Sequence, residues 1–196
     1  RDSLEIWDVQ LIVLGKVLNE KRKEFIKNII PIFNNYYNYI SSETESVSLD
    51  YKSQLNDDDF EVLLSRNIEK DRILQYTTTG IHKDDLTFDL SGQPLKKNAS
   101  QGQQKTYLIA LKLAQFDYIK QISGIKPVLL FDDIFDKLDT ERVKQIIHLV
   151  ADNHFGQIFI TDTNRERLLR ILNEIHITYK LFDMKEDINE FVENFE

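Results

Sequence analysis

The chain has 196 residues, 41% of them hydrophobic and 30% charged, which is the balance of an ordinary globular domain and excludes a disordered chain. The net charge of −8 excludes a uniformly basic nucleic-acid-binding surface, so contact with DNA would need a local basic patch or residues outside this chain. The absence of cysteine excludes disulfides and thiolate metal sites, and no apolar run approaches the ~20 residues of a membrane helix, so a cytoplasmic protein without membrane contact is expected.

Residues 1–40 are predicted to form a long helix, which Pro31 should end or kink. Apolar residues recur there at three- and four-residue spacing, as on one helix face. A basic cluster lies along the same helix. It consists of Lys16, Lys21, Arg22, Lys23 and Lys27. A solvated helix face is the more usual role of such a cluster, and contact with DNA phosphates is the alternative.

The middle of the chain mixes strand and helix patterns. Residues 47–51 alternate between apolar and polar, as a half-buried strand does. Asn56 and the three acidic residues after it are typical of a helix start, and this helix should reach about Arg72. A second strand is expected at 73–79, and a hairpin at 84–97 with its turn at 91–94.

From residue 99 onward the pattern predicts an α/β fold. A helix is expected from 103 to about 122, followed by an apolar strand at 128–131 that should be buried on both faces. Asp139 and Asn164 should each cap a helix, with strands at 158–160 and 177–182. This β-α-β-α-β order predicts a parallel sheet with right-handed crossovers. The acidic tail after residue 183 should be a solvated helix or a frayed end.

Two acidic residues, Asp132 and Asp133, follow directly on the apolar strand at 128–131. Ligands of open α/β sheets bind beyond the carboxyl ends of the strands. Crowding two like charges there is costly unless a cation binds them, and Mg²⁺ prefers carboxylate oxygens. The pair therefore indicates a magnesium site, although strand ends and helix caps also carry such residues.

A second set of residues, Ser100, Gln101, Gly102 and Gln103, lies at the start of the helix after residue 99. A helix N-terminus offers unpaired N–H groups and a partial positive charge to an anion, and glycine lets a backbone approach closely. This tip suits a terminal phosphate, but an ordinary serine-capped helix has the same sequence pattern.

These motifs, taken in order, resemble the C-terminal lobe of ABC-type ATPases of the SMC-like group, and more closely the RecF family. The resemblance rests on GIHKDDL at 80–86, ASQGQQK at 99–105, LLFDD at 129–133 and KLD at 137–139. It covers most of the chain. Ile81 and Lys83 depart from the family pattern, which has Pro and Arg at these positions.

The resemblance implies a role for each motif. Asp132, in the Walker B strand, would hold the Mg²⁺ of an ATP molecule, and Asp133 would orient the attacking water. Ser100, Gln101, Gly102 and Gln103 form the signature helix tip, which would meet the γ-phosphate of ATP held by a second copy. Asp139 belongs to the D-loop at the interface between the copies.

The resemblance also implies an organisation and a set of partners. Residues 1–46 would be a helical arm, 47–98 a connecting region, 99–183 part of an ATPase head, and 184–196 an acidic tail. The expected partners are a second copy in an ATP-dependent homodimer, duplex DNA, single-strand/double-strand junctions, RecR and RecO. The expected process is recombinational repair of gaps.

The chain contains no G-x-x-x-x-G-K-[ST] phosphate loop and begins with Arg1 rather than Met. We therefore interpret it as a fragment that binds ATP weakly or not at all by itself. Two alternatives remain open: a Mg²⁺-dependent Toprim-like nuclease or phosphotransfer domain, and a non-catalytic head-like interaction module.

Overall fold

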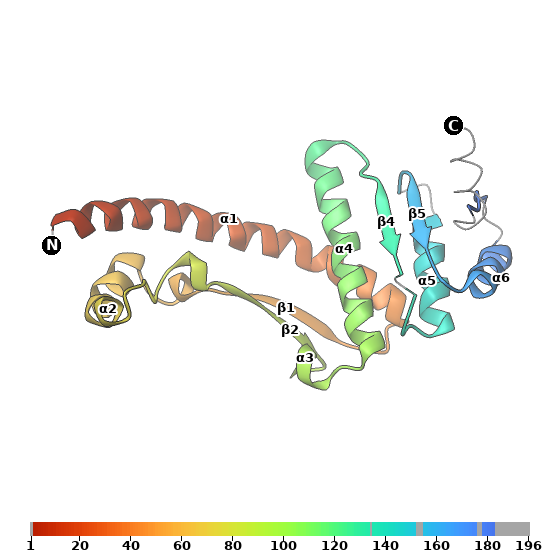
Figure 1. Ribbon diagram of the computed structural model, residues 1–196, viewed down its shortest axis with the longest axis horizontal. Coiled ribbons are helices and arrows are strands. Elements are labelled where there is room, and N and C mark those ends of the chain that lie inside the picture. Colours follow the sequence, from red (N-terminus) through yellow and green to blue (C-terminus); the bar gives the residue numbers. More distant parts are fainter. Residues whose placement is uncertain (1, 134, 152–154, 176–177, 183–196) are drawn as a thin grey trace, which may run out of the picture.

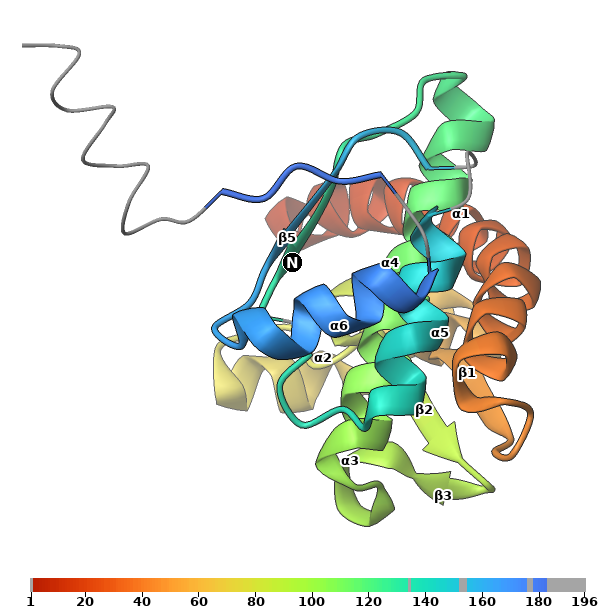
Figure 2. The ribbon, with the colours of Figure 1, turned by 90° about the vertical axis from the view of Figure 1, so that its right-hand side faces the viewer.

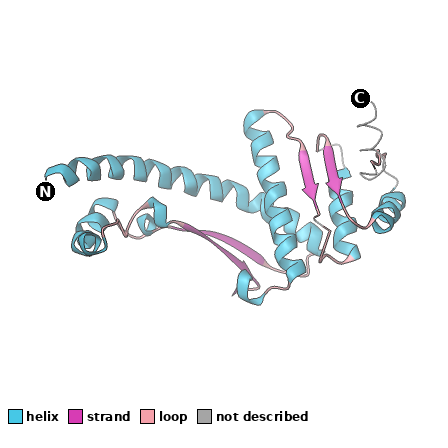
Figure 3. Ribbon diagram, viewed as in Figure 1, coloured by secondary structure: helices cyan, strands magenta, loops and turns pink. Residues whose placement is uncertain are grey.

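A computed structural model describes residues 2–133, 135–151, 155–175 and 178–182. A long helix extends from an α/β unit, and a small antiparallel sheet lies beneath it (Figure 1). The small sheet and the parallel strand pair are separate (Figure 3). None of the described helices is long and apolar enough to cross a membrane.

The long helix α1 spans Asp2–Ser41 and confirms the predicted helix at 1–40. It does not end at Pro31, which lies inside it. Proline removes only one backbone hydrogen bond, whereas Ile29 and Phe33 on either side of it are anchored in the core. The helix ends where Ser42 and Glu43 both adopt left-handed backbone conformations.

The small sheet has the order β1-β2-β3. Strand β1 (Val47–Lys52) pairs antiparallel with β2 (Asp85–Leu90), and β2 turns through Gly92 to β3 (Gln93–Pro94). The predicted hairpin is thus confirmed, although its last residues belong to the short helix α3 (Leu95–Asn98).

Two predictions between residues 53 and 80 are wrong. Asn56 ends a short 3-10 helix, η1 (Gln54–Asn56), and the cap of α2 (Phe60–Leu74) is Asp59, which accepts a hydrogen bond from the Glu61 N–H. The strand expected at 73–79 is absent, because α2 continues to Leu74 and Gln75 ends it in a left-handed conformation. A second 3-10 helix, η2, spans Ile81–Lys83.

The remaining elements form the α/β unit. They are α4 (Gln101–Ser123), β4 (Leu129–Asp132), α5 (Thr140–Ala151), β5 (Ile158–Thr161) and α6 (Arg165–Ile175). Strands β4 and β5 are parallel, as predicted, with Leu130 opposite Phe159. The third strand is wrong where it can be checked, because 178–182 are not in a strand; Ile177 and the acidic tail lie outside the described residues.

The described residues cover the β4–β5 pair on one face only, which overturns the expectation that residues 128–131 are buried on both faces. Helices α4 and α5 lie on one side of the two strands (Figure 2). Leu129 and Phe131 are buried on that side. On the opposite face Leu130 is 70% exposed and Phe159 is 47% exposed.

A single core joins most of these elements. Helix α1 contributes Ile29, Phe33 and Tyr37, and α4 contributes Tyr107 and Leu113. This core continues into β1, β4, α5 and α6, so it crosses the boundaries expected at residues 46 and 98. A smaller cluster of Phe60, Leu63 and Leu64 attaches α2 to the N-terminal half of α1.

Candidate functional site

The tip of α4 begins with a capping box between Ser100 and Gln103. The Ser100 hydroxyl oxygen accepts a hydrogen bond from the Gln103 N–H at 3.2 Å, and the Gln103 side-chain oxygen accepts one from the Ser100 N–H at 2.8 Å. The serine-cap interpretation is therefore correct. Ser100 is also exposed, so its hydroxyl and the first turn of α4 remain accessible to an anion.

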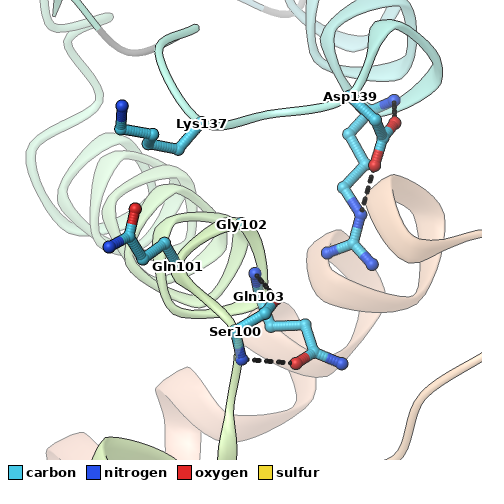
Figure 4. Close-up of a pocket in the computed structure, with 7 residues that line it drawn as sticks. Ser100, Gln101, Gly102, Gln103, Lys137 and Asp139 are labelled. Carbon is cyan, nitrogen blue, oxygen red and sulfur yellow. Dashed lines mark hydrogen bonds and ion pairs between the residues drawn. The ribbon is translucent and has the colours of Figure 1, made fainter.

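A hollow of about 510 Å³ lies beside this tip (Figure 4). It brings together all four predicted tip residues and Asp139. Its lining residues are Ser100, Gln101, Gly102, Gln103, Lys137, Asp139 and Arg142. The hollow thus lies between the start of α4 and the loop that precedes α5.

Gly102 is the point of closest approach between the helix tip and this loop. A Cβ atom placed on Gly102 would lie 3.0 Å from the backbone oxygen of Lys137, closer than side chains normally pack. Lys137 itself has a left-handed backbone, with φ of 66°. The glycine therefore has a role within this chain, in addition to the predicted approach of a phosphate.

Asp139 caps α5, as predicted. Its Oδ1 accepts a hydrogen bond from the Arg142 N–H at 2.8 Å, and its Oδ2 lies 3.2 Å from the Arg142 Nε. The Asp139 side chain is otherwise exposed at the rim of the hollow.

Asp132 and Asp133 occupy the carboxyl end of β4, outside this hollow. The Thr161 hydroxyl donates to Asp132 Oδ1 at 2.6 Å and accepts from the Asp133 N–H at 3.1 Å. Asp133 has a left-handed backbone, with φ of 44°, and its carbonyl oxygen accepts from Lys105 Nζ at 2.7 Å. Lys105 thereby links the signature helix to the turn that carries both aspartates.

These aspartates suit a nucleotide-bound Mg²⁺ better than a cage of protein ligands. Asp132 is exposed and held in place by Thr161. No group of three or more metal-ligating side chains occurs among the described residues. Mg²⁺ usually takes one or two carboxylates and completes its shell with water and phosphate oxygens.

Three of the five basic residues on α1 are already paired. Lys16 bonds to Asp59 at 2.7 Å, and Lys23 to Glu20 at 2.9 Å. Arg22 donates to the nearly buried Asp84 and to the Ile81 carbonyl. Lys21 and Lys27 are exposed and form no ion pair with another described residue. The cluster is thus partly a set of structural contacts that hold η2 and α2 on α1.

Sequence reasoning missed four residues around the site: Glu45, Lys105, Arg142 and Thr161. Lys105 lies within the ASQGQQK motif. Arg142 stands three residues after Asp139, and side chains at this spacing on a helix can contact each other. Glu45 and Thr161 carry no such signal, because only the tertiary fold brings them to the site.

The fold and the site define the class of this protein. A capped helix tip, a parallel strand ending in two aspartates, and a capped loop against the helix tip occur in the order that the resemblance assigns to the signature and Walker B parts of an ABC-type ATPase head. No family model matches the chain.

The comparisons show which proteins this chain is similar to. The chain is 54% identical over 183 residues to the DNA replication and repair protein RecF of Flavobacterium johnsoniae, and 48% identical over 183 residues to that of Bacteroides thetaiotaomicron. These alignments cover 93% of this chain but 51% and 50% of the relatives. The chain is therefore a homologue of RecF and spans about half the length of the curated relatives it matches.

A solved structure shows the same fold. It is described as the recombination mediator protein RecF-ATPrS in the RecFOR pathway. It superposes with a TM-score of 0.70 at 27% identity and covers 85% of this chain and 46% of its own. This structural similarity confirms the α/β fold class that the sequence predicts.

Proposed function

We propose that this chain is the part of a RecF-type ATPase that supplies the signature tip and the Walker B aspartates to nucleotide sites shared between two copies. One observation carries the proposal: the exposed α4 tip and the exposed Asp132 lie at different places on one chain, linked through Lys105 and Asp133. Because the two half-sites do not face the same hollow, a symmetric dimer would complete each of them with the other half-site of the second copy.

Each residue has a distinct role in this proposal. Asp132, held by Thr161, offers carboxylate oxygen to the Mg²⁺ that accompanies ATP, and this ion supplies charge neutralisation for phosphoryl transfer. Asp133 positions the attacking water. The Ser100 hydroxyl and the free N–H groups at the start of α4 bind the γ-phosphate held by the other copy.

The wider function follows from the homologues. Their name, DNA replication and repair protein RecF, and the RecFOR pathway of the solved structure support action in recombinational gap repair, with DNA, RecO and RecR as partners. On α1, Lys21 and Lys27 are the members of the basic cluster best placed for DNA phosphate, because the other three have partners within the chain.

The first test separates the two half-sites in an intact protein carrying this chain. We expect Asp133→Asn to bind ATP and dimerise but to lose ATP turnover by on the order of 100-fold or more. We expect Ser100→Arg to bind ATP as a monomer but not to dimerise, because the bulky side chain fills the γ-phosphate position. ATP hydrolysis and ATP-dependent sedimentation measure these effects.

Glu166→Gln, an exposed change in the first turn of α6, is the matched control and should alter neither property. Unchanged turnover in Asp133→Asn would contradict the proposal and favour a non-catalytic head-like module. DNA cleavage abolished by Asp132→Ala would favour a Toprim-like nuclease instead.

A further inference from the structure

We propose that Glu45 and Arg142 are positioning residues: together they hold the Ser100–Gln103 helix tip and the Lys137–Asp139 loop in the relative placement that a partner's nucleotide requires. This inference rests on the proposed function, because it concerns the geometry of the same half-site. Neither residue belongs to the sequence motifs, and both reach the site only through the tertiary fold.

Glu45 lies in the turn that follows α1 and receives three donors from three elements. The Tyr37 hydroxyl of α1 donates to its Oε2. The Gln103 side-chain nitrogen donates to its Oε1 at 2.9 Å, and Arg142 donates to the same oxygen at 2.8 Å. The Glu45 side chain is only 14% exposed.

The backbone before Glu45 shows that this placement is imposed by the fold. Ser42 and Glu43 have φ values of 55° and 58°, a region that is costly for residues other than glycine. The Glu43 N–H bonds to the Asn38 carbonyl at 2.8 Å, which turns the chain back over the end of α1. This tight reversal directs Glu45 toward α4 and α5.

Arg142 uses all three nitrogens of its guanidinium for different partners. Its Nε lies 3.2 Å from Asp139, its Nη1 donates to the Thr106 hydroxyl at 2.9 Å, and its Nη2 donates to Glu45. The planar fork of arginine can do this, whereas a lysine ammonium cannot reach all three. The Arg142 side chain is 15% exposed.

These contacts commit the Gln103 side chain to this chain rather than to a ligand. Its oxygen accepts from the Ser100 N–H and its nitrogen donates to Glu45. Glu45 therefore fixes the orientation of the amide that completes the capping box. Arg142 fixes Asp139 at the same time, so one ion pair sets both walls of the hollow.

The strength of this arrangement comes from its charge and its shielding from water. Hydrogen bonds to charged groups are about twice as strong as neutral ones, and a partly buried pair is less screened than a surface pair. Thr106, which Arg142 also contacts, is fully buried. Removing one member leaves the other charged group poorly solvated, which should displace the tip and loop.

The test uses the intact protein and the variants Arg142→Met, Arg142→Lys and Glu45→Gln. We expect Arg142→Met to weaken ATP-dependent dimerisation by on the order of tenfold or more, since small misplacements at a reacting site have large effects. ATP binding to the monomer, measured with a fluorescent ATP analogue at low protein concentration, should change less than about twofold. Arg142→Lys should lie between the wild type and Arg142→Met.

The matched control is Lys144→Met, which removes the ion pair between Lys144 of α5 and Glu174 of α6. It should leave dimerisation unchanged. A double-mutant cycle adds a readout that general destabilisation would not give: Glu45→Gln should weaken dimerisation less in the Arg142→Met background than in the wild type, because the two residues share one contact.

Two results would overturn the inference. The first is that Arg142→Met dimerises as strongly as Lys144→Met. The second is that Arg142→Met loses monomer ATP binding, dimerisation and thermal stability to the same extent, which marks a purely structural role. Failure of the proposed function looks different, because Ser100→Arg would then dimerise normally. If Ser100→Arg loses dimerisation and Arg142→Met does not, only the positioning inference fails.

Discussion

At the residue scale, folding changes the pKa of the Glu45 carboxyl group. Burial alone would raise its pKa, yet hydrogen bonds from Tyr37, Gln103 and Arg142 outweigh burial and hold the pKa below its usual value. Folding therefore favours the ionised form. Its contribution to the free energy of unfolding is complete above about pH 4.5 and is lost as the pH falls through the lowered folded-state pKa.

We expect the stability difference between the wild type and Glu45→Gln to be constant near neutral pH and to shrink below about pH 4.5. Urea unfolding of the intact protein over a series of pH values measures it. The Arg142→Met background is the control, because a main donor to Glu45 is missing there and the pH dependence should be weaker. A difference that stays constant into the acid range would contradict the assignment.

At the scale of elements, the position of the site depends on how α4 docks. Its buried Tyr107 packs against Phe33 and Tyr37 of α1 and Phe88 of β2. The Tyr107 hydroxyl donates to the Ser48 carbonyl of β1 at 2.7 Å, and burial raises the pKa of this tyrosine. Helix α4 is thus fixed to both the long helix and the small sheet.

Tyr107→Phe keeps the ring contacts and removes this hydrogen bond. We expect it to lower the free energy of unfolding by about 1–2 kcal/mol, since a partly buried carbonyl loses its partner. Chemical denaturation measures the loss. Tyr39→Phe, on an exposed tyrosine of α1, should change stability by less than about 0.5 kcal/mol. Equal effects of the two changes would show that the Ser48 contact does not anchor α4.

The elements with local signals were predictable from sequence. Helix α4 follows a serine cap, α5 follows Asp139, and the alternation around Leu49 marks β1. Predictions failed where tertiary contacts decide: Asp71 accepts hydrogen bonds from Thr78 and fixes a turn where a strand was expected. An apolar run such as Val128–Phe131 cannot reveal whether one sheet face or both are covered within the same chain.

The residues of the site likewise differ in whether a local sequence pattern reveals them. Ser100, Gly102 and Asp139 stand in short motifs whose order along the chain is informative, and the structure places them around one hollow. Glu45 is 58 residues from Gln103 and 97 from Arg142 in sequence. No local pattern specifies such a contact, so the residues that hold the motifs in place become visible only in the folded chain.

At the scale of the whole molecule, one face of β4 and β5 is left uncovered by the residues that the structure describes. Leu130 and Phe159 are opposite each other on that face and are largely exposed. Adjacent exposed apolar side chains on a sheet usually mark an interface. The curated relatives are about twice as long as this chain, so we expect the remainder of a full-length protein to cover the face.

The pair Leu130 and Leu129 tests this expectation, because the two neighbours point to opposite faces of β4. In the 196-residue chain, Leu130→Lys should leave the thermal unfolding midpoint unchanged and raise solubility, whereas Leu129→Lys should prevent folding, because Leu129 is buried. In the intact protein both changes should destabilise, with Leu130→Lys costing about 3 kcal/mol or more, since its charge would then be buried as well. Differential scanning fluorimetry of both lengths measures the contrast. If Leu130→Lys leaves the unfolding midpoint of the intact protein unchanged, this face is open to solvent there, and the remainder of the protein does not cover it.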